Sequence, residues 1–185
     1  KESKNISLKS RAIDKVVLNY SKELSGIQSK NNLIEYISDN ININDEINLP
    51  TQTTFYQIED NIDISVSYSV QNSHFEEGVY IDESLSSESR AGYFPSENLV
   101  ISDPLIFRGL VIRQITFYPY RLNLLTGELE VYDNVNFSIE EHEVEDVRNY
   151  HQKKRSKAFE PLYESMIINY ESSTREEDYQ NPAIL

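Results

Sequence analysis

The stretch "IDISVSYSV" at residues 62–70 decides the fold, because apolar and polar side chains alternate along it without a break. Every second position is apolar, and the positions between hold one aspartate and three serines. This period of two places the apolar side chains on one face of a β-strand and the polar ones on the other. One buried face and one solvated face are typical of an antiparallel sheet.

More strands are predicted on both sides of this stretch. Thirteen Tyr and seven Phe accompany many Ile and Val residues, which is a strand-forming composition. Similar short segments lie at residues 15–20, 33–38, 53–58, 78–82, 98–102, 110–120, 128–132 and 135–140. "RLNLLTGELEVY" (121–132) predicts a hairpin that turns at Thr126 and Gly127, and "YDNV" (132–135) predicts a second reversal. This spacing favours a two-sheet sandwich, with a closed barrel as the alternative.

The pattern changes near the C-terminal end. "AFEPLYESMIINY" (158–170) has six apolar side chains at helical spacing, and Pro161 is acceptable in a first helical turn. The sequence therefore predicts an antiparallel β-sandwich over residues 1–157, a closing amphipathic helix over 158–171, and a tail over 172–185 that is polar until its last three residues.

Composition excludes several classes of function. The 185 residues suit one domain, and 17 Lys and Arg against 31 Asp and Glu give a net charge of -14, which repels nucleic-acid phosphates. There is no cysteine to form a disulfide, a thiolate metal site or a thiol nucleophile. No apolar run has the length of a membrane span.

Motifs for catalysis or cofactor binding are also missing from the sequence. It contains no G-x-S-x-G, and five glycines are too few for a phosphate-binding loop. His142 alternates with glutamates on one predicted strand, whereas a metal site needs ligands from more than one element. His74 and His151 are isolated. We therefore expect no catalytic residue, no metal and no cofactor.

One arginine is conspicuous because it has no basic neighbours. From residue 31 through residue 107 the chain has fourteen Asp and Glu, and Arg90, in "SSESRAGYFPS" (86–96), is the only Lys or Arg. Arg90 is either a solvated loop residue or a point that a partner recognises.

Two further basic segments are candidates for proteolysis. "KKRSK" (153–157) suits exposed ion pairs or a loop open to trypsin-like cleavage at Lys153, Lys154 or Arg155. "STRE" (173–176) follows the predicted helix in a polar segment, where a protease can bind the chain in extended form. It is either a processing site or an ordinary tail arginine.

Two blocks of sequence carry a resemblance to a known family. "YFPSENLVISDPLIFRG" (93–109) followed by "ITFYPYRLNLLTGELEVYDNVNFSI" (115–139), and then "FEPLYESMIINYESSTR" (159–175), resemble the N-terminal prodomain of gingipain-type cysteine peptidases. A weaker match is "LPTQTTFYQIEDNIDISVSYS" (49–69), so that the similarity covers about residues 47–175. The matching residues of the first block are Phe94, Pro95, Ser102, Asp103, Pro104, Arg108, Asn123, Thr126, Leu129, Val131, Tyr132 and Val135.

The resemblance implies a jelly-roll-like β-sandwich, a non-catalytic domain that assists the folding of a peptidase and blocks its active site until it is cut away. Its partner would be the catalytic domain of a gingipain-like peptidase, in the periplasm or at the cell surface after type IX secretion. Ser89, Arg90 and Ala91 match a loop whose basic residue enters the specificity pocket, which implies that Arg90 is the inhibitory residue. Cleavage after Arg175 would leave Glu176 at the start of the next part of the precursor. Residues 172–185 would then be a cleavable linker and the start of a truncated catalytic domain.

Two alternatives use the same fold. One is a retained N-terminal domain of a sortase-like enzyme of type IX secretion. The other is a β-sandwich that binds glycans or another protein through the aromatic face at residues 117–132. Aromatics that alternate along a strand are more often core residues than a sugar-binding platform.

Overall fold

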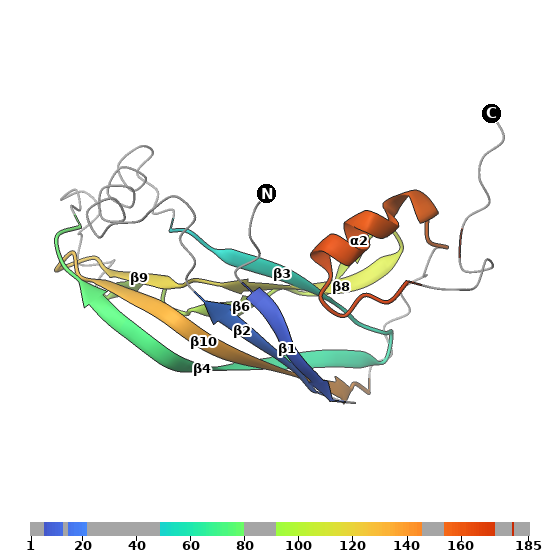
Figure 1. The fold of residues 1–185 in the computed structure, drawn as a ribbon, viewed down its shortest axis with the longest axis horizontal. Helices are drawn as coiled ribbons and strands as arrows, with labels where there is room; N and C mark the ends of the chain where they lie inside the picture. The colour runs from blue at the N-terminus through green and yellow to red at the C-terminus, as the bar shows by residue number, and fades with distance from the viewer. Residues whose placement is uncertain are drawn as a thin grey trace.

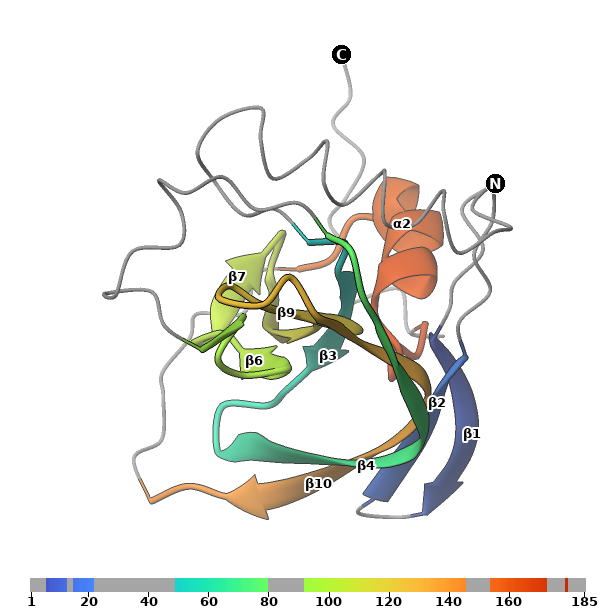
Figure 2. The same ribbon diagram turned by 90° about the vertical axis from the view of Figure 1, so that its left-hand side faces the viewer.

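The computed structural model describes residues 6–12, 15–21, 49–79, 92–145, 154–172 and 179. These residues form two antiparallel sheets that pack face to face, and a short α-helix lies near the C-terminal end (Figures 1 and 2). The predicted antiparallel sandwich with a C-terminal helix is thereby confirmed.

The larger sheet is organised by one long strand, β10. Its six strands are β1 (Ile6–Ala12), β2 (Lys15–Ser21), β4 (Ile62–Glu76), β5 (Tyr93–Phe94), β9 (Tyr120–Asn123) and β10 (Leu129–Glu143). One edge of β10 pairs with β4 over its whole length. The other edge pairs first with β9 and then with β2, so β10 joins every part of this sheet.

The smaller sheet is organised in the same way by β8. Its four strands are β3 (Gln52–Gln57), β6 (Leu99–Ile101), β7 (Leu105–Phe107) and β8 (Leu110–Phe117). β3 pairs with one edge of β8, and the two short strands β6 and β7 share the other edge.

The core fills the space between the sheets and follows the period of two. Val135, Phe137 and Ile139 of β10 are buried and alternate with partly exposed polar residues. Phe117 of β8 faces them, with its ring centroid 4.9 Å from that of Phe137. Phe117 and Tyr120 are 1% and 2% exposed, so these two rings of the aromatic run at 117–123 belong to the core and are not available as a sugar-binding platform, whereas Tyr118 is half-buried.

A helix covers the outer face of the smaller sheet. The 3-10 turn η2 (Lys157–Phe159) leads into α2 (Glu160–Met166), and Pro161 lies in the first turn as predicted. Tyr163 of α2 and Ile167 pack on Leu110 and Ile112 of β8, with α2 above β3 and β8 in Figure 1. The side chains of β8 thus alternate between the core and the helix.

The predicted helix over 158–171 is wrong in its extent, because α2 ends at Met166. Ile167 is extended, and the N–H of Ile168 donates to the carbonyl oxygen of Phe55 at 3.0 Å. The side-chain amide of Asn169 then accepts from the N–H of Gln57 at 2.7 Å and donates to its carbonyl oxygen at 2.8 Å. Pairing with the free edge of β3 replaces the last helical turn.

The predicted reversal at "YDNV" is also wrong. β10 continues through residues 133 and 134, and its register with β4 shifts there. Tyr132 is opposite Ser73 and Val135 is opposite Val70, so each strand absorbs an irregularity and the apolar face is maintained. Such bulges bend a strand without ending it.

Other strand predictions differ at their ends. Gly78 and Val79 belong to no strand, and residues 80–82 and 33–38 lie outside the described residues. β1 was not predicted from the sequence.

Candidate functional site

The segment that carries Arg90 lies between Val79 and Gly92 in the chain. Ser89, Arg90 and Ala91 lie outside the described residues. The structure does describe the base of this segment, where both of its ends meet the turn between β9 and β10.

The same turn holds both ends of the segment. The N–H of Val79 donates to the carbonyl oxygen of Gly127 at 3.3 Å, and the N–H of Leu124 donates to that of Gly92 at 3.1 Å. Within the turn, the N–H of Gly127 donates to the carbonyl oxygen of Asn123 at 2.9 Å. The base of the 80–91 segment is therefore fixed to residues 123–128.

Gly127 is required at this base for two reasons. Its φ of +69° lies in the left-handed region, which glycine adopts without steric penalty. A Cβ built on Gly127 would lie 2.4 Å from the carbonyl oxygen of Val79. The turn and the first end of the segment are thus in direct backbone contact, and the predicted turn at Thr126 and Gly127 is confirmed.

Side-chain contacts fix the chain that follows the segment, at residues 93–96. The hydroxyl of Tyr93 donates to Oε1 of Glu128 at 2.8 Å, and this hydrogen bond is the main reason why the pKa of Tyr93 is raised. The guanidinium of Arg121 lies 4.9 Å from the centroid of the Tyr93 ring. Nε and Nη2 of Arg121 donate to the carbonyl oxygens of Pro95 and Ser96, each at 3.3 Å.

Arg121 was not identified as a site residue from the sequence. The available signal is its position between Tyr120 and Leu122, whose side chains are 2% and 0% exposed. A charged residue between two buried strand residues points away from the core, and here it reaches the neighbouring strand β5.

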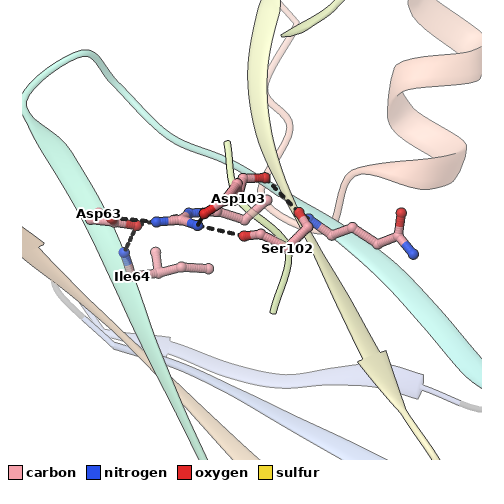
Figure 3. Close-up of polar contacts among 6 residues, drawn as sticks. Asp63, Ile64, Ser102 and Asp103 are labelled. Carbon is pink, nitrogen blue, oxygen red and sulfur yellow. Dashed lines mark hydrogen bonds and ion pairs between the residues drawn. The ribbon is translucent and has the colours of Figure 1, made fainter. Parts of the chain in front are cut away.

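A second polar cluster joins the two sheets and is shown in Figure 3. Arg113 of β8 donates from Nε to Oδ1 of Asp63 of β4 at 2.9 Å, and from Nη2 to Oδ2 of the same carboxylate. Its Nη1 donates to the carbonyl oxygen of Ser102. The side chains of Arg113 and Asp63 are only 12% and 9% exposed.

This cluster gives the Ser102-Asp103-Pro104 part of the matched block a structural role. Oγ of Ser102 accepts from the N–H of Gln114 at 3.0 Å and donates to the carbonyl oxygen of Asp103 at 2.7 Å. The segment after β6 is thereby fixed to β8, and its Ser102 carbonyl oxygen is held against Arg113.

The proposed proteolytic residues fall only partly in the described chain. Lys153, Arg175 and Glu176 lie outside the described residues, and Lys154 is exposed. Arg155 has defined contacts: its Nη1 donates to the carbonyl oxygen of Glu171 at 3.1 Å and to the hydroxyl of Tyr170 at 3.4 Å. A peptidase that cleaves after Arg155 must first open these contacts.

The described histidines are structural or exposed. His74 lies between two carboxylates, with Nδ1 2.6 Å from Oδ2 of Asp133 and Nε2 3.2 Å from Oε1 of Glu76. His142 is exposed at the end of β10, and His151 is outside the described residues. Within the described part of the chain, no group of three His, Asp or Glu side chains is arranged so that it could hold a metal ion.

In the same part of the chain, no helix has the length and apolar character needed to cross a bilayer.

Fold and site together define a class of protein: an antiparallel β-sandwich in which one turn fixes both ends of a segment with a single basic residue. Residues 20–177 match the Propeptide_C25 family, and the chain belongs to this family. As a propeptide it is a non-catalytic part of a precursor.

Similar curated proteins agree with this assignment. The chain is 29% identical over 97 residues to gingipain R1 of Porphyromonas gingivalis, a match that covers 51% of this chain and 10% of that protein. It is equally similar to gingipain R1 of the P. gingivalis strain ATCC 33277, of which it covers 6%. The chain thus spans a small part of the length of these relatives.

Solved structures share the fold. The chain matches the complex of P. gingivalis RgpB pro- and mature domains with a TM-score of 0.56 and 16% identity, over 92% of this chain and 100% of that chain. It matches a structure describing the zymogenic latency of gingipain K of P. gingivalis with a TM-score of 0.51 and 9% identity, over 77% of this chain and 94% of that chain.

Proposed function

We propose that this chain is the prodomain of a gingipain-like cysteine peptidase, that it assists the folding of the catalytic domain, and that it keeps the zymogen inactive by inserting Arg90 into the specificity pocket. The observation that carries the proposal is the fixed base of the 80–91 segment. The only basic residue between positions 31 and 107 lies on this segment, and both ends of the segment are hydrogen-bonded to one turn.

A fixed base favours inhibition by this residue. Arg90 precedes Gly92 by two residues, so covalent geometry keeps their Cα atoms within about 7 Å of each other. Holding a loop near its bound position reduces the conformational entropy that binding would otherwise remove. An arginine can also form two parallel, charge-assisted hydrogen bonds with a carboxylate at the base of a pocket.

The proposed partner is the catalytic domain of the same precursor. Support comes from the propeptide family and from the solved RgpB complex, which contains both a pro- and a mature domain. The proposal includes secretion by the type IX route, with release in the periplasm or at the cell surface.

The direct test is inhibition of the cognate mature peptidase by the 185-residue chain and by Arg90→Ala. Removing a desolvated, partnered charge weakens binding by about 2 to 5 kcal/mol, which corresponds to an inhibition constant roughly 30-fold to several thousand-fold larger. Arg148→Ala, which removes an arginine from the connector after β10, is the control and should inhibit like the wild type. An Arg90→Ala variant that inhibits equally well would refute the role of Arg90.

Processing after Arg175 is tested separately on the precursor. Intact-mass analysis should find a mature species that begins at Glu176, and Arg175→Gln should prevent its appearance. A wild-type precursor that stays full-length would contradict removal and would favour a retained structural domain.

A further inference from the structure

Tyr179 follows the proposed cleavage bond in the chain, yet it is buried against the segment that precedes α2. It is 6% exposed, and it forms a parallel β-bridge with Arg155. A buried tyrosine contributes a large apolar area to the contact it makes.

The segment that receives Tyr179 is defined by residues 155–157. We call it the docking strand for short, although only Arg155 pairs there, in an isolated bridge, and Lys157 is the first residue of η2. Nζ of Lys157 lies 5.2 Å from the centroid of the Tyr179 ring, within the range of a cation–π contact. Arg155 supplies the backbone bridge. The docking strand therefore offers two kinds of interaction, main-chain pairing and a cation over the ring.

The docking strand is itself fixed to the helix. The guanidinium of Arg155 lies 5.3 Å from the centroid of the Tyr170 ring, and the Tyr170 hydroxyl donates to Oε1 of Glu160 at 2.7 Å. Glu160 is the first residue of α2. A receptor held in this way loses little conformational entropy when a peptide binds to it.

Both flanks of the proposed cleavage bond contact this strand. On the N-terminal flank, the carbonyl oxygen of Glu171 accepts from Arg155 at 3.1 Å, and on the C-terminal flank Tyr179 pairs with the same residue. Cutting between the two flanks removes the covalent link but neither of these contacts.

We propose that the docking strand retains the segment that follows the cleavage bond, and that Tyr179 anchors this segment to the prodomain after the bond is cut. The occupant is the part of this same chain that begins at Glu176, held at Tyr179 by the parallel bridge to Arg155 and by the contact of its ring with Lys157. The inference rests on the proposed cleavage and adds a second attachment to the one made by Arg90. Two linked contacts dissociate far more slowly than either one alone.

The proposal also gives a role to the basic cluster at 153–157. A second cut after Lys154 would separate the docking strand from the chain before it. A second cut after Arg155 would divide the docking strand itself. Release of the prodomain would then follow the second cut and not the first.

The test uses an engineered cut, so that it does not depend on the natural processing enzyme. The recognition sequence of an unrelated, sequence-specific endopeptidase replaces residues 173–178 of the 185-residue chain, and a fluorophore labels Leu185. After cutting, fluorescence anisotropy during dilution gives the dissociation constant of the labelled peptide. The peptide from the parent chain should remain bound, and Tyr179→Ala should raise the constant by about 10-fold or more.

Matched variants separate the ring from other effects. Tyr179→Phe keeps the ring and should stay within about 3-fold of the parent chain. Tyr118→Ala removes a half-buried tyrosine elsewhere and should leave retention unchanged, and circular dichroism should show the same fold in all variants. The proposal is overturned if the parent peptide leaves at once, or if Tyr179→Ala binds as tightly as Tyr179→Phe. No peptidase partner is present, so neither result depends on Arg90 or Arg175.

Discussion

Arg113 is a buried charge that links the two sheets through one carboxylate. All three of its nitrogens donate to Asp63 or Ser102, and Oδ1 of Asp63 also accepts from the N–H of Ile64 at 2.8 Å. A buried ion pair of this kind fixes the relative position of two elements and gives little net stability, because both charges lose their hydration.

We predict that Arg113→Met destabilises the chain strongly, by about 3 to 5 kcal/mol, because it leaves Asp63 buried without its cation. Asp63→Leu combined with Arg113→Met should recover much of this loss, since no unpaired charge then remains. Urea unfolding of the single and double variants measures both effects. A double variant that is less stable than Arg113→Met would show that the pair itself is the stabilising feature.

The three arginines Arg90, Arg113 and Arg121 differ in how far the sequence alone points to them as candidate site residues. Arg90 can be recognised because its isolation among acidic residues is visible along the chain. The alternation along β9 indicates only that Arg121 points away from the core. The roles of Arg113 and Arg121 cannot be read from the sequence, because their partners lie 50 and 26 residues away and meet them only in the folded sheets.

Among the elements, the β9–β10 turn matters most for function, because the base of the 80–91 segment is built on it. The local sequence predicts this turn correctly. Oδ1 of Asn123 accepts from the N–H groups of Leu125 and Thr126, and Gly127 supplies the positive φ. A local turn of this type is encoded by its own side chains.

We predict that Gly127→Ala is more harmful than Gly78→Ala. Both glycines have positive φ, but an added Cβ meets the carbonyl oxygen of Val79 only at Gly127 and meets nothing within 4 Å at Gly78. Gly78→Ala should cost roughly 1 kcal/mol of unfolding free energy, and Gly127→Ala roughly 2 kcal/mol or more.

Gly127→Ala should also weaken inhibition of the cognate peptidase, because it displaces the base of the segment that carries Arg90. Urea midpoints and inhibition constants for the two variants provide the measurement. Equal effects of the two substitutions would contradict the importance of the contact with Val79.

The elements that were predicted wrongly depend on distant partners. The apolar spacing of residues 158–170 suits a helix, yet residues 167–169 pair with β3, which the local pattern does not contain. Likewise, "YDNV" has the composition of a turn, but β4 supplies a matching irregularity opposite it and the strand continues.

At the scale of the whole molecule, buried tyrosines couple stability to alkaline pH. Burial is the main cause that raises the pKa of Tyr20, Tyr132 and Tyr163 in the folded chain. In the unfolded chain these hydroxyls ionise near pH 10. Their stabilising effect is therefore fully present below pH 10 and is lost as the pH rises, because the unfolded state releases protons that the folded state keeps.

We predict that each of these tyrosines lowers the unfolding free energy by about 1.4 kcal/mol per pH unit above pH 10, up to the pKa that it has in the folded chain. Urea midpoints at pH 9, 10 and 11 should fall accordingly. Tyr20→Phe removes one ionisable group and should give a shallower decline. A midpoint that is constant from pH 9 to pH 11 would contradict the prediction.

The length and position of β10 have a consequence for the order in which the chain is made. Glu76 of β4 pairs with Leu129, and Ile62 pairs with Glu143, so the upstream strands are synthesised long before their partner. Until β10 emerges from the ribosome, the edges of β4 and β2 that it covers have no strand to pair with. Pairings between distant segments form slowly, and open strand edges can join other chains. Translation of residues 129–143 is thus the step that turns a vulnerable nascent chain into a closed domain.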